Sequence, residues 1–327
     1  NCNHPKDERR VVRHADTSRY PRMPARRHLA GHAAHNQRAG CIPPCVGANP
    51  YVAPRKKGAR TMWTAHETEA NGLRIHYLRT GGNLPALVLA HGATDSGACW
   101  GRVAAALSDR YDVIAPDARG HGQTDAPAED YSRTTMAADL AAFIRALGLE
   151  HPIVAGHSMG AATVLTLIST HPELARAAIL EDPGLRIGGG DENRMVAMRA
   201  RMRDEHAQRQ AMTHEQVVAA GKASHPLWHD DEFDAWAHAK HRVSVNFLAP
   251  SNVPPAPDWQ SQLPHVTCPV LLVRADAAPL ADGAVTAEAA AVAQGLCPTL
   301  EVAHVAGAGH NVRREQFDAF MAAVVPF

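Results

Sequence analysis

A serine between two glycines is the residue in this 327-residue chain with the clearest potential for chemistry. The segment Gly156-His157-Ser158-Met159-Gly160 follows an apolar run over 152–155 and precedes a helix-forming run over 161–171. This order predicts a nucleophile elbow, a sharp strand-to-helix turn that lifts a serine hydroxyl out of a sheet. Positions 156 and 160 must be small, because side chains there would strike the neighbouring strand and helix. The turn also places the Met159 N–H at a helix start, where it can stabilise an oxyanion.

Two other segments complete a recognisable order along the chain. His91-Gly92 follows the apolar strand-like run 86–90, and His310 ends a glycine-containing loop that follows the strand-like run 300–305. Strand-His-Gly, then strand-Gly-His-Ser-Met-Gly, then a late loop ending in histidine resembles the α/β-hydrolase fold family from residue 62 to residue 327. The resemblance implies that Ser158 attacks a carbonyl and that His310 is its general base, with the N–H groups of Ala93 and Met159 forming the oxyanion hole.

The segment Asp117-Ala118-Arg119-Gly120-His121-Gly122 resembles the D-x-R-G-x-G turn of the same family. Its glycines permit tight turns, so we assign this segment a structural role and no catalytic one.

The acid that should accompany the histidine is not at its usual place. The family usually carries it after the seventh strand, at a position held here by Ala278. Asp276 lies two residues earlier on that loop, and Asp182 ends the preceding strand in Leu180-Glu181-Asp182-Pro183-Gly184. Either carboxylate could be held by a strand end and accept the second N–H of the histidine. We favour Asp182 and keep Asp276 as the alternative.

Strand-like and helix-like runs alternate after residue 61, which predicts an α/β fold with a mostly parallel sheet and helices on both faces. Short, almost wholly apolar strands are typical of strands buried on both faces. The expected strands are 73–77, 86–90, 111–116, 152–156, 177–180, 270–273 and 300–305, and the expected helices are 99–107, 134–147, 161–171, 284–294 and 316–325.

About eighty polar, helix-favouring residues interrupt this alternation between the sixth and seventh strands. We therefore expect a core over 61–184 and 265–327, with a helical cap over 185–264. The cap contains methionine and aromatic residues that either roof the serine or glue the cap to the core, namely Met195, Met198, Met202, Trp228, Phe233, Trp236 and Trp259. Such a lid favours a sizeable, largely apolar ester or lactone as the small-molecule substrate.

Residues 1–60 differ from the rest of the chain in charge. Of the 33 basic and 33 acidic residues, 13 basic and 3 acidic lie there, which leaves 20 and 30 for the remainder. This segment has many Pro, Arg and His and little apolar periodicity, so we expect it to be disordered or a non-native leader before Met62. A basic arm for nucleic acid or anionic surfaces and a transit peptide are the alternatives.

Composition limits the other classes of function. No apolar run approaches the roughly 18 residues of a membrane span, and six scattered cysteines suit a reduced, cytoplasmic protein. The pairs His225/His229 and His238/His241 could hold a metal on a helix face, but they lack further ligands at suitable spacing, so we expect no metal and no cofactor. We expect neither nucleic acid nor a membrane as partner, and the oligomeric state stays open, a homo-oligomer included.

These observations predict a serine hydrolase of carboxylic esters or lactones that works through an acyl-enzyme. Carbon–carbon bond hydrolases and cofactor-free haloperoxidases use the same triad and remain alternatives. A ligand receptor that keeps the triad without turnover is an alternative from another class.

Overall fold

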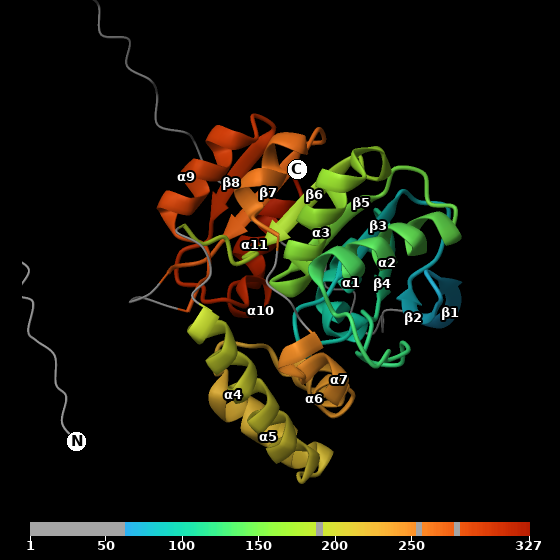
Figure 1. The fold of residues 1–327 in the computed structure, drawn as a ribbon, viewed down its shortest axis with the longest axis vertical. Helices are drawn as coiled ribbons and strands as arrows, with labels where there is room; N and C mark the ends of the chain where they lie inside the picture. Colours follow the sequence, from blue (N-terminus) through green and yellow to red (C-terminus); the bar gives the residue numbers. More distant parts are fainter. Residues whose placement is uncertain (1–62, 188–191, 253–256, 278–281) are drawn as a thin grey trace, which may run out of the picture. The chain divides into compact units, whose positions relative to one another are not determined.

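The computed structural model describes residues 63–187, 192–252, 257–277 and 282–327 (Figure 1). The leader predicted over residues 1–60 lies outside the described residues. One eight-stranded sheet has the strand order β1-β2-β4-β3-β5-β6-β7-β8. The strands are β1 (Thr64–Ala70), β2 (Leu73–Arg79), β3 (Ala86–Ala90), β4 (Asp112–Pro116), β5 (Ile153–His157), β6 (Ala177–Glu181), β7 (Val270–Arg274) and β8 (Leu300–His304).

Strands β3 to β8 pair in parallel, whereas β1 with β2 and β2 with β4 are antiparallel. In the parallel part the register sets Gly156 opposite Ala90 on one side and Leu180 on the other. The carboxyl ends of β5, β6, β7 and β8 therefore lie side by side at one edge of the sheet. Any side chains that follow these strands are brought close together there.

Helices cover both faces of the sheet, and the strand side chains alternate between two apolar layers. One layer joins Val154 and Leu272 to α2 (Arg133–Ala146), α3 (Met159–Thr170) and α9 (Ala287–Leu296). The other joins Ala155 and Leu271 to α1 (Gly101–Leu107) and α11 (Phe317–Val324). Burial on both faces explains why these strands are almost wholly apolar in sequence.

The chain between β6 and β7 forms a set of helices that lies at the bottom of Figure 1. The helices labelled there are α4 (Glu192–Gln210), α5 (His214–Ser224), α6 (Phe233–His241) and α7 (Val245–Leu248). The same part of the chain also forms α8 (Trp259–Gln262), which packs against α3. Helix α5 begins with a capping box in which Thr213 and Gln216 satisfy each other's backbone N–H. The predicted architecture is confirmed: a mostly parallel sheet with helices on both faces and a helical cap between the sixth and seventh strands.

The bulky cap residues do not act as one roof. Trp228, Phe233 and Trp236 pack with Val217 and Ala237 into a small core inside the cap. Met198 is exposed, and Trp259 packs against the main core and donates its indole N–H to the Arg186 carbonyl. Met202 packs against the apolar cluster that includes Met159. Met195 falls where no side chain is described.

The first strand of the sheet, β1, lies outside the strands predicted from the sequence. Strand β1 was not predicted, because its sequence TAHETEA is exposed at nearly every position and has no apolar alternation. The strand exists because it pairs along its whole length with β2 at the edge of the sheet.

No helix in the described part of the chain is both long and apolar enough to cross a membrane.

Backbone packing at the elbow generates a prediction about stability. A Cβ at Gly160 would collide with the Ala90 carbonyl, whereas a Cβ at Gly101 meets nothing within 4 Å. We expect Gly160→Ala to lower the free energy of unfolding by about 1–3 kcal/mol because the core is overpacked. Gly101→Ala is the control and should leave it unchanged or raise it by up to about 1 kcal/mol. Urea denaturation of both variants measures this, and equal midpoints would contradict the predicted collision.

Candidate active site

Ser158 stands at the junction between β5, which ends at His157, and α3, which begins at Met159. Its backbone has φ 51° and ψ −111°, a conformation that L-residues rarely adopt. The Ser158 N–H donates to the Glu181 carbonyl at 2.9 Å, which anchors the turn to the neighbouring strand. A residue held in this way presents its side chain above the sheet edge.

His310 reaches this serine from the loop after β8. Its Nε2 lies 2.9 Å from the Ser158 Oγ, and its Nδ1 lies 2.6 Å from the Asp182 Oδ2. The Asp182 carboxylate is fully buried, while 28% of the His310 side chain is exposed. The three side chains form one continuous hydrogen-bonded chain from a buried carboxylate to a hydroxyl.

The structure brings Asp182, and not Asp276, to this histidine. Asp182 follows β6 with φ 45° and accepts the N–H groups of Ala284 at 2.7 Å and Val285 at 3.0 Å. These two bonds fix the carboxylate so that Oδ2 also faces His310. Asp276 instead contacts the His304 ring at 2.7 Å and the Gly307 N–H at 2.8 Å. The favoured position is thus the one next to the histidine, and the alternative belongs to an exposed ion pair.

Two opposing effects set the pKa of His310. Burial lowers it, but the hydrogen bond with Asp182 and the negative charge of that carboxylate outweigh burial, so the pKa is raised above 6.5. A raised pKa means that the protonated imidazole is stabilised. This is the species that a general base becomes after it accepts a proton.

A second histidine holds the first one in place. The buried His157 ring has its Nε2 2.9 Å from the His310 carbonyl oxygen. Burial lowers the pKa of His157 well below 6.5, so the ring is neutral and Nε2–H is the donor. A Cβ at Gly92 would strike this ring, which ties the glycine of the His91-Gly92 pair to the site. This role of His157 does not follow from the sequence, because the middle positions of the serine motif carry no fixed residue type.

The N–H groups of Ala93 and Met159 are free to bind an anion. Among the described residues, neither has a hydrogen-bond acceptor. His91 braces the Ala93 loop, since its ring nitrogens lie 2.8 Å from the Gly92 carbonyl and 2.9 Å from the Ala118 N–H. The two unpaired donors are suited to stabilise a negatively charged oxygen beside Ser158.

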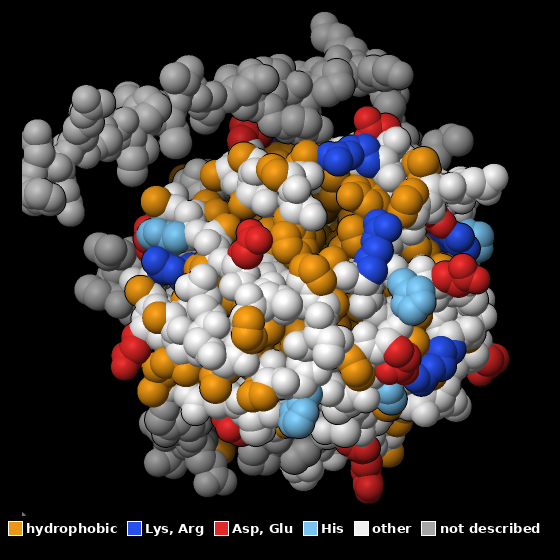
Figure 2. All heavy atoms as spheres, turned by 90° about the horizontal axis from the view of Figure 1, so that it is seen from above, with side chains coloured by type: hydrophobic (Ala, Val, Ile, Leu, Met, Phe, Trp, Pro, Cys, Tyr) orange, Lys and Arg blue, Asp and Glu red, His pale blue; other side chains and the backbone are white. Residues whose placement is uncertain are grey.

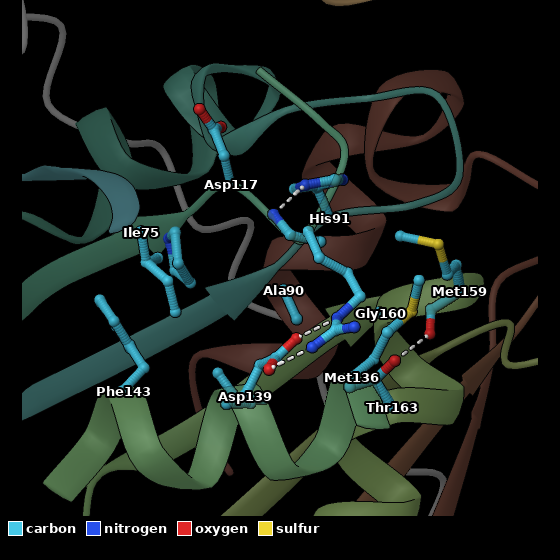
Figure 3. Close-up of a pocket in the computed structure, with 14 residues that line it drawn as sticks. Ile75, Ala90, His91, Asp117, Met136, Asp139, Phe143, Met159, Gly160 and Thr163 are labelled. Atoms are coloured by element: carbon cyan, nitrogen blue, oxygen red, sulfur yellow. Dashed lines mark hydrogen bonds and ion pairs between the residues drawn. The ribbon is translucent and has the colours of Figure 1, made fainter. Parts of the chain in front are cut away.

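A cavity of about 50 Å³ lies behind Met159, between α2, α3 and the sheet (Figure 3). Its lining is mainly apolar, and Figure 3 shows Met136 and Met159 on one side and Ile75 and Phe143 on the other. The Arg119 guanidinium, which also lines it, is closed off by two hydrogen bonds to Asp139, at 2.5 and 2.8 Å. No free charge or nucleophile faces this space, so it backs the oxyanion residue without adding chemistry.

Two arginines near Met159 lack an acidic partner in the described part of the chain. Arg133 of α2 donates from Nη1 to the Met159 carbonyl at 3.2 Å, and its buried Nε has no partner. Burial and the nearby Arg199 of α4 lower the pKa of Arg133 to about 10. Burial also lowers the pKa of Arg199. Met202, three residues after Arg199, packs on the same cluster as Met159 and Ala93. Two uncompensated positive charges beside the site are suited to a carboxylate.

One group of described side chains has metal-ligand spacing. Ligand atoms of His214, Asp234 and His238 lie within 4.8 Å of one another on α5 and α6. The His214 Nε2 is 2.9 Å from the Asp234 Oδ1, and His238 and Asp234 are largely exposed. A surface ion pair accounts for this group, and we assign it no role. The sequence singled out the pairs His225/His229 and His238/His241 as possible metal ligands. In the structure the His225 ring stacks on the Trp228 ring, with the ring centroids 4.0 Å apart.

Known proteins share this fold and much of its length. Residues 87–323 match the sequence model of the Alpha/beta hydrolase family. N-formylmaleamate deformylase of Pseudomonas putida is 30% identical over 274 residues, which is 82% of this chain and 97% of that protein. The 2-(acetamidomethylene)succinate hydrolase of Mesorhizobium japonicum is 29% identical over 259 residues, 76% of this chain and 90% of that one. A crystal structure of the Pseudomonas putida S16 N-formylmaleamic acid deformylase superposes with a TM-score of 0.66 and 25% identity, over 80% of this chain and all of that one.

The contact between Asp182 and His310 generates a prediction about pH. Only a neutral imidazole can accept the serine proton, and Asp182 raises the pKa of His310. We expect kcat/KM for p-nitrophenyl acetate to fall as the pH drops, with its midpoint above 6.5. Asp182→Asn should move this midpoint to lower pH and reduce the rate at its plateau by about 10³–10⁴.

Asp276→Asn is the matched control, because it removes an equivalent carboxylate from the end of the neighbouring strand. We expect its midpoint to be unchanged and its plateau rate to stay within about threefold of the unmodified protein. A large loss in Asp276→Asn with little change in Asp182→Asn would assign the acid to the other strand.

Proposed function

The chain belongs to the Alpha/beta hydrolase family, and we propose that it hydrolyses a carboxylic acid derivative through an acyl-enzyme formed on Ser158. The observation that carries this proposal is the hydrogen-bonded chain from Asp182 through His310 to Ser158. A serine hydroxyl is a weak nucleophile unless an adjacent base removes its proton as it attacks. The chain of bonds supplies that base and the carboxylate that stabilises its charged form.

The reaction follows from the positions of these groups. The Ser158 Oγ attacks the carbonyl carbon while the His310 Nε2 accepts its proton, and the carbonyl oxygen becomes an oxyanion that accepts the N–H groups of Ala93 and Met159. His310 then gives the proton to the leaving nitrogen or oxygen, which breaks the acyl bond. A water molecule, deprotonated by His310, attacks the acyl carbon and releases Ser158. All steps use groups of this chain and water.

The substrate we favour is a small N-acyl compound that carries a carboxylate. Arg133 and Arg199 give the site two positive charges that no described acid compensates. The names of the two relatives describe an N-formyl and an acetamido compound, a maleamate and a succinate. The charge at the site supports an anionic substrate, and the names of the two relatives support an amide. This proposal replaces the largely apolar substrate expected from the composition of the cap.

A carboxylic ester or lactone is the second candidate. An alcohol is a better leaving group than an amine, so a serine activated in this way also cleaves activated esters. Activated esters therefore serve as neutral probes in the experiments below. Carbon–carbon bond hydrolases and haloperoxidases use the same triad and differ from both candidates in the bond that they act on, whereas a receptor would bind without repeated turnover.

A small molecule remains the proposed partner of this chain. On the face drawn in Figure 2, basic and acidic side chains are interspersed, and hydrophobic side chains show near the centre of the view. Binding of nucleic acid relies on basic side chains gathered in one patch. The charges on this face therefore do not favour nucleic acid as a partner.

Covalent labelling tests the acyl-enzyme. We expect a fluorophosphonate to add one equivalent to the folded protein at Ser158, located by mass spectrometry, because His310 activates that hydroxyl. Ser158→Ala should abolish the adduct and lower kcat for p-nitrophenyl acetate by about 10³-fold or more, with unchanged folding. A Ser158→Ala variant that keeps its turnover would exclude the proposed mechanism.

The role of the arginines is tested with a charged and a neutral substrate. We expect Arg133→Met to raise KM for N-formylmaleamate by about 10- to 100-fold, since a charge-assisted bond to the carboxylate is lost. The kcat/KM for neutral p-nitrophenyl acetate should stay within about threefold, because no bond to a substrate carboxylate is involved.

The control is Arg145→Met, an arginine of the same helix that forms an exposed ion pair with Glu173. This variant should leave KM for N-formylmaleamate and kcat/KM for p-nitrophenyl acetate unchanged. Equal losses for the charged and the neutral substrate in Arg133→Met would mean that Arg133 only supports the elbow.

A further inference from the structure

The loop that carries Ala93 is strained and held from several sides. Thr94 has φ 61°, which is unfavourable for a β-branched residue. Two contacts use N–H groups of the loop: the Asp95 N–H donates to the Gly92 carbonyl within the loop at 3.1 Å, and the Thr94 N–H points to His121 Nε2 at 3.4 Å. These contacts leave the Thr94 carbonyl and hydroxyl to be satisfied by something else.

A lysine from the cap satisfies both. Lys240 of α6 has its Nζ 3.0 Å from the Thr94 carbonyl, 2.7 Å from the Thr94 Oγ1 and 3.0 Å from the Asp95 Oδ1. An ammonium group has three N–H donors, and all three are directed at two consecutive residues of this loop. Of the described residues of the cap, Lys240 is the one with hydrogen bonds to Thr94 and Asp95.

Lys240 is also buried, and only a few per cent of its side chain is exposed. Burying an ammonium group is costly unless it is paired, and burial lowers the pKa of Lys240. Asp95, its partner, also lies 3.1 Å from Arg314, which is 3.2 Å from Glu232. Glu232 comes from the cap as well, in the short helix Asp230–Glu232. A buried charge cluster thus joins the cap to the loop that carries Ala93.

We propose that Lys240 is a positioning residue that holds the Ala93 loop in its oxyanion-binding conformation, so that the oxyanion hole is complete only while the cap is docked. This inference rests on the proposed role of the Ala93 N–H. A lysine that merely fixed the cap would support stability and substrate binding. A lysine that positions Ala93 must in addition support the charge that develops on the carbonyl oxygen.

Lys240→Met tests this directly in the full chain, because it keeps the length and the apolar stem of the side chain and removes its three donors. Asp95 keeps its arginine partner in this variant. With p-nitrophenyl acetate we expect kcat to fall by about 30- to 100-fold, somewhat less than the loss of an oxyanion donor itself, and KM to stay within about threefold. Phenylboronic acid forms a tetrahedral adduct with a reactive serine, so its inhibition constant should rise by about tenfold or more.

The matched control is Lys222→Met, which removes a lysine of the same cap. Lys222 pairs with Asp230 at 2.6 Å on an exposed surface. The Lys222→Met variant should keep both the kcat for p-nitrophenyl acetate and the inhibition constant of phenylboronic acid unchanged. Fluorophosphonate titration of Ser158 in each variant counts the folded sites, so that a loss of rate is not confused with a loss of folded protein.

Thr94→Val is the second variant, and it tests the positioning role of Lys240 if Lys240→Met does not fold. It has the shape of threonine and removes only the oxygen that lies 2.7 Å from the Lys240 Nζ. We expect kcat to fall by about 3- to 10-fold and the inhibition constant of phenylboronic acid to rise by a similar factor.

The outcomes separate this inference from the proposed function. If Lys240→Met, fully labelled by fluorophosphonate, keeps kcat and its affinity for phenylboronic acid within twofold, the positioning role is excluded while the acyl-enzyme stands. The same result in Thr94→Val excludes it when Lys240→Met is unfolded. A rise in KM alone would assign Lys240 to substrate binding and would also overturn the inference. Turnover by Ser158→Ala would remove the proposed function itself.

Discussion

The close approach of the start of α3 to β3 and β5 is the constraint on which the rest of the site depends. Gly160 lies against the Ala90 carbonyl and Gly156 lies against Gly160, with no room for a Cβ at either position. This contact between backbones forces Ser158 into its unusual conformation, and the hydrogen bond to Glu181 holds it there. Strain at such a residue persists only because the surrounding structure determines its position. Burial of the two apolar layers on either side of the sheet stabilises the fold and so offsets the backbone strain at Ser158.

Once the elbow is fixed, the parallel order of β5 to β8 brings the other groups to it. This part of the site could be predicted from the sequence, because a serine after β5 and a histidine after β8 must meet at the same edge of the sheet. The choice between Asp182 and Asp276 could not be made in the same way. Both follow strands between those two, and the loop N–H groups that each accepts fix its carboxylate in a different place. Those bonds depend on the fold of residues around 284 and 307, which no sequence pattern specifies.

Charged residues within the polar cap were harder to foresee. Lys240 and Arg199 occur in a segment rich in charge, where a basic residue is usually solvated. One signal was nevertheless present on α6. Phe233, Trp236, Ala237 and Lys240 recur at helical spacing, so the lysine occupies the buried face, and the structure shows all four buried. A charge at a core-facing position of an amphipathic helix predicts a buried partner on the element opposite. No comparable signal exists for Arg133, whose neighbours in sequence are polar on both sides.

The cap therefore contributes charge to the surroundings of the site in addition to apolar contacts. Its own small core uses Trp228, Phe233 and Trp236, which keeps α5 and α6 together. Toward the core the cap directs apolar side chains as well as two cations, namely Met202, Val243, Phe247, Leu248, Arg199 and Lys240. These cations differ in a way that suits their proposed roles. Lys240 is neutralised by Asp95 and can hold the loop without a ligand whenever the cap is docked, whereas Arg199 and Arg133 repel each other. A substrate carboxylate would relieve that repulsion, so binding and cap docking would favour each other, and the oxyanion hole would be complete when the substrate is bound.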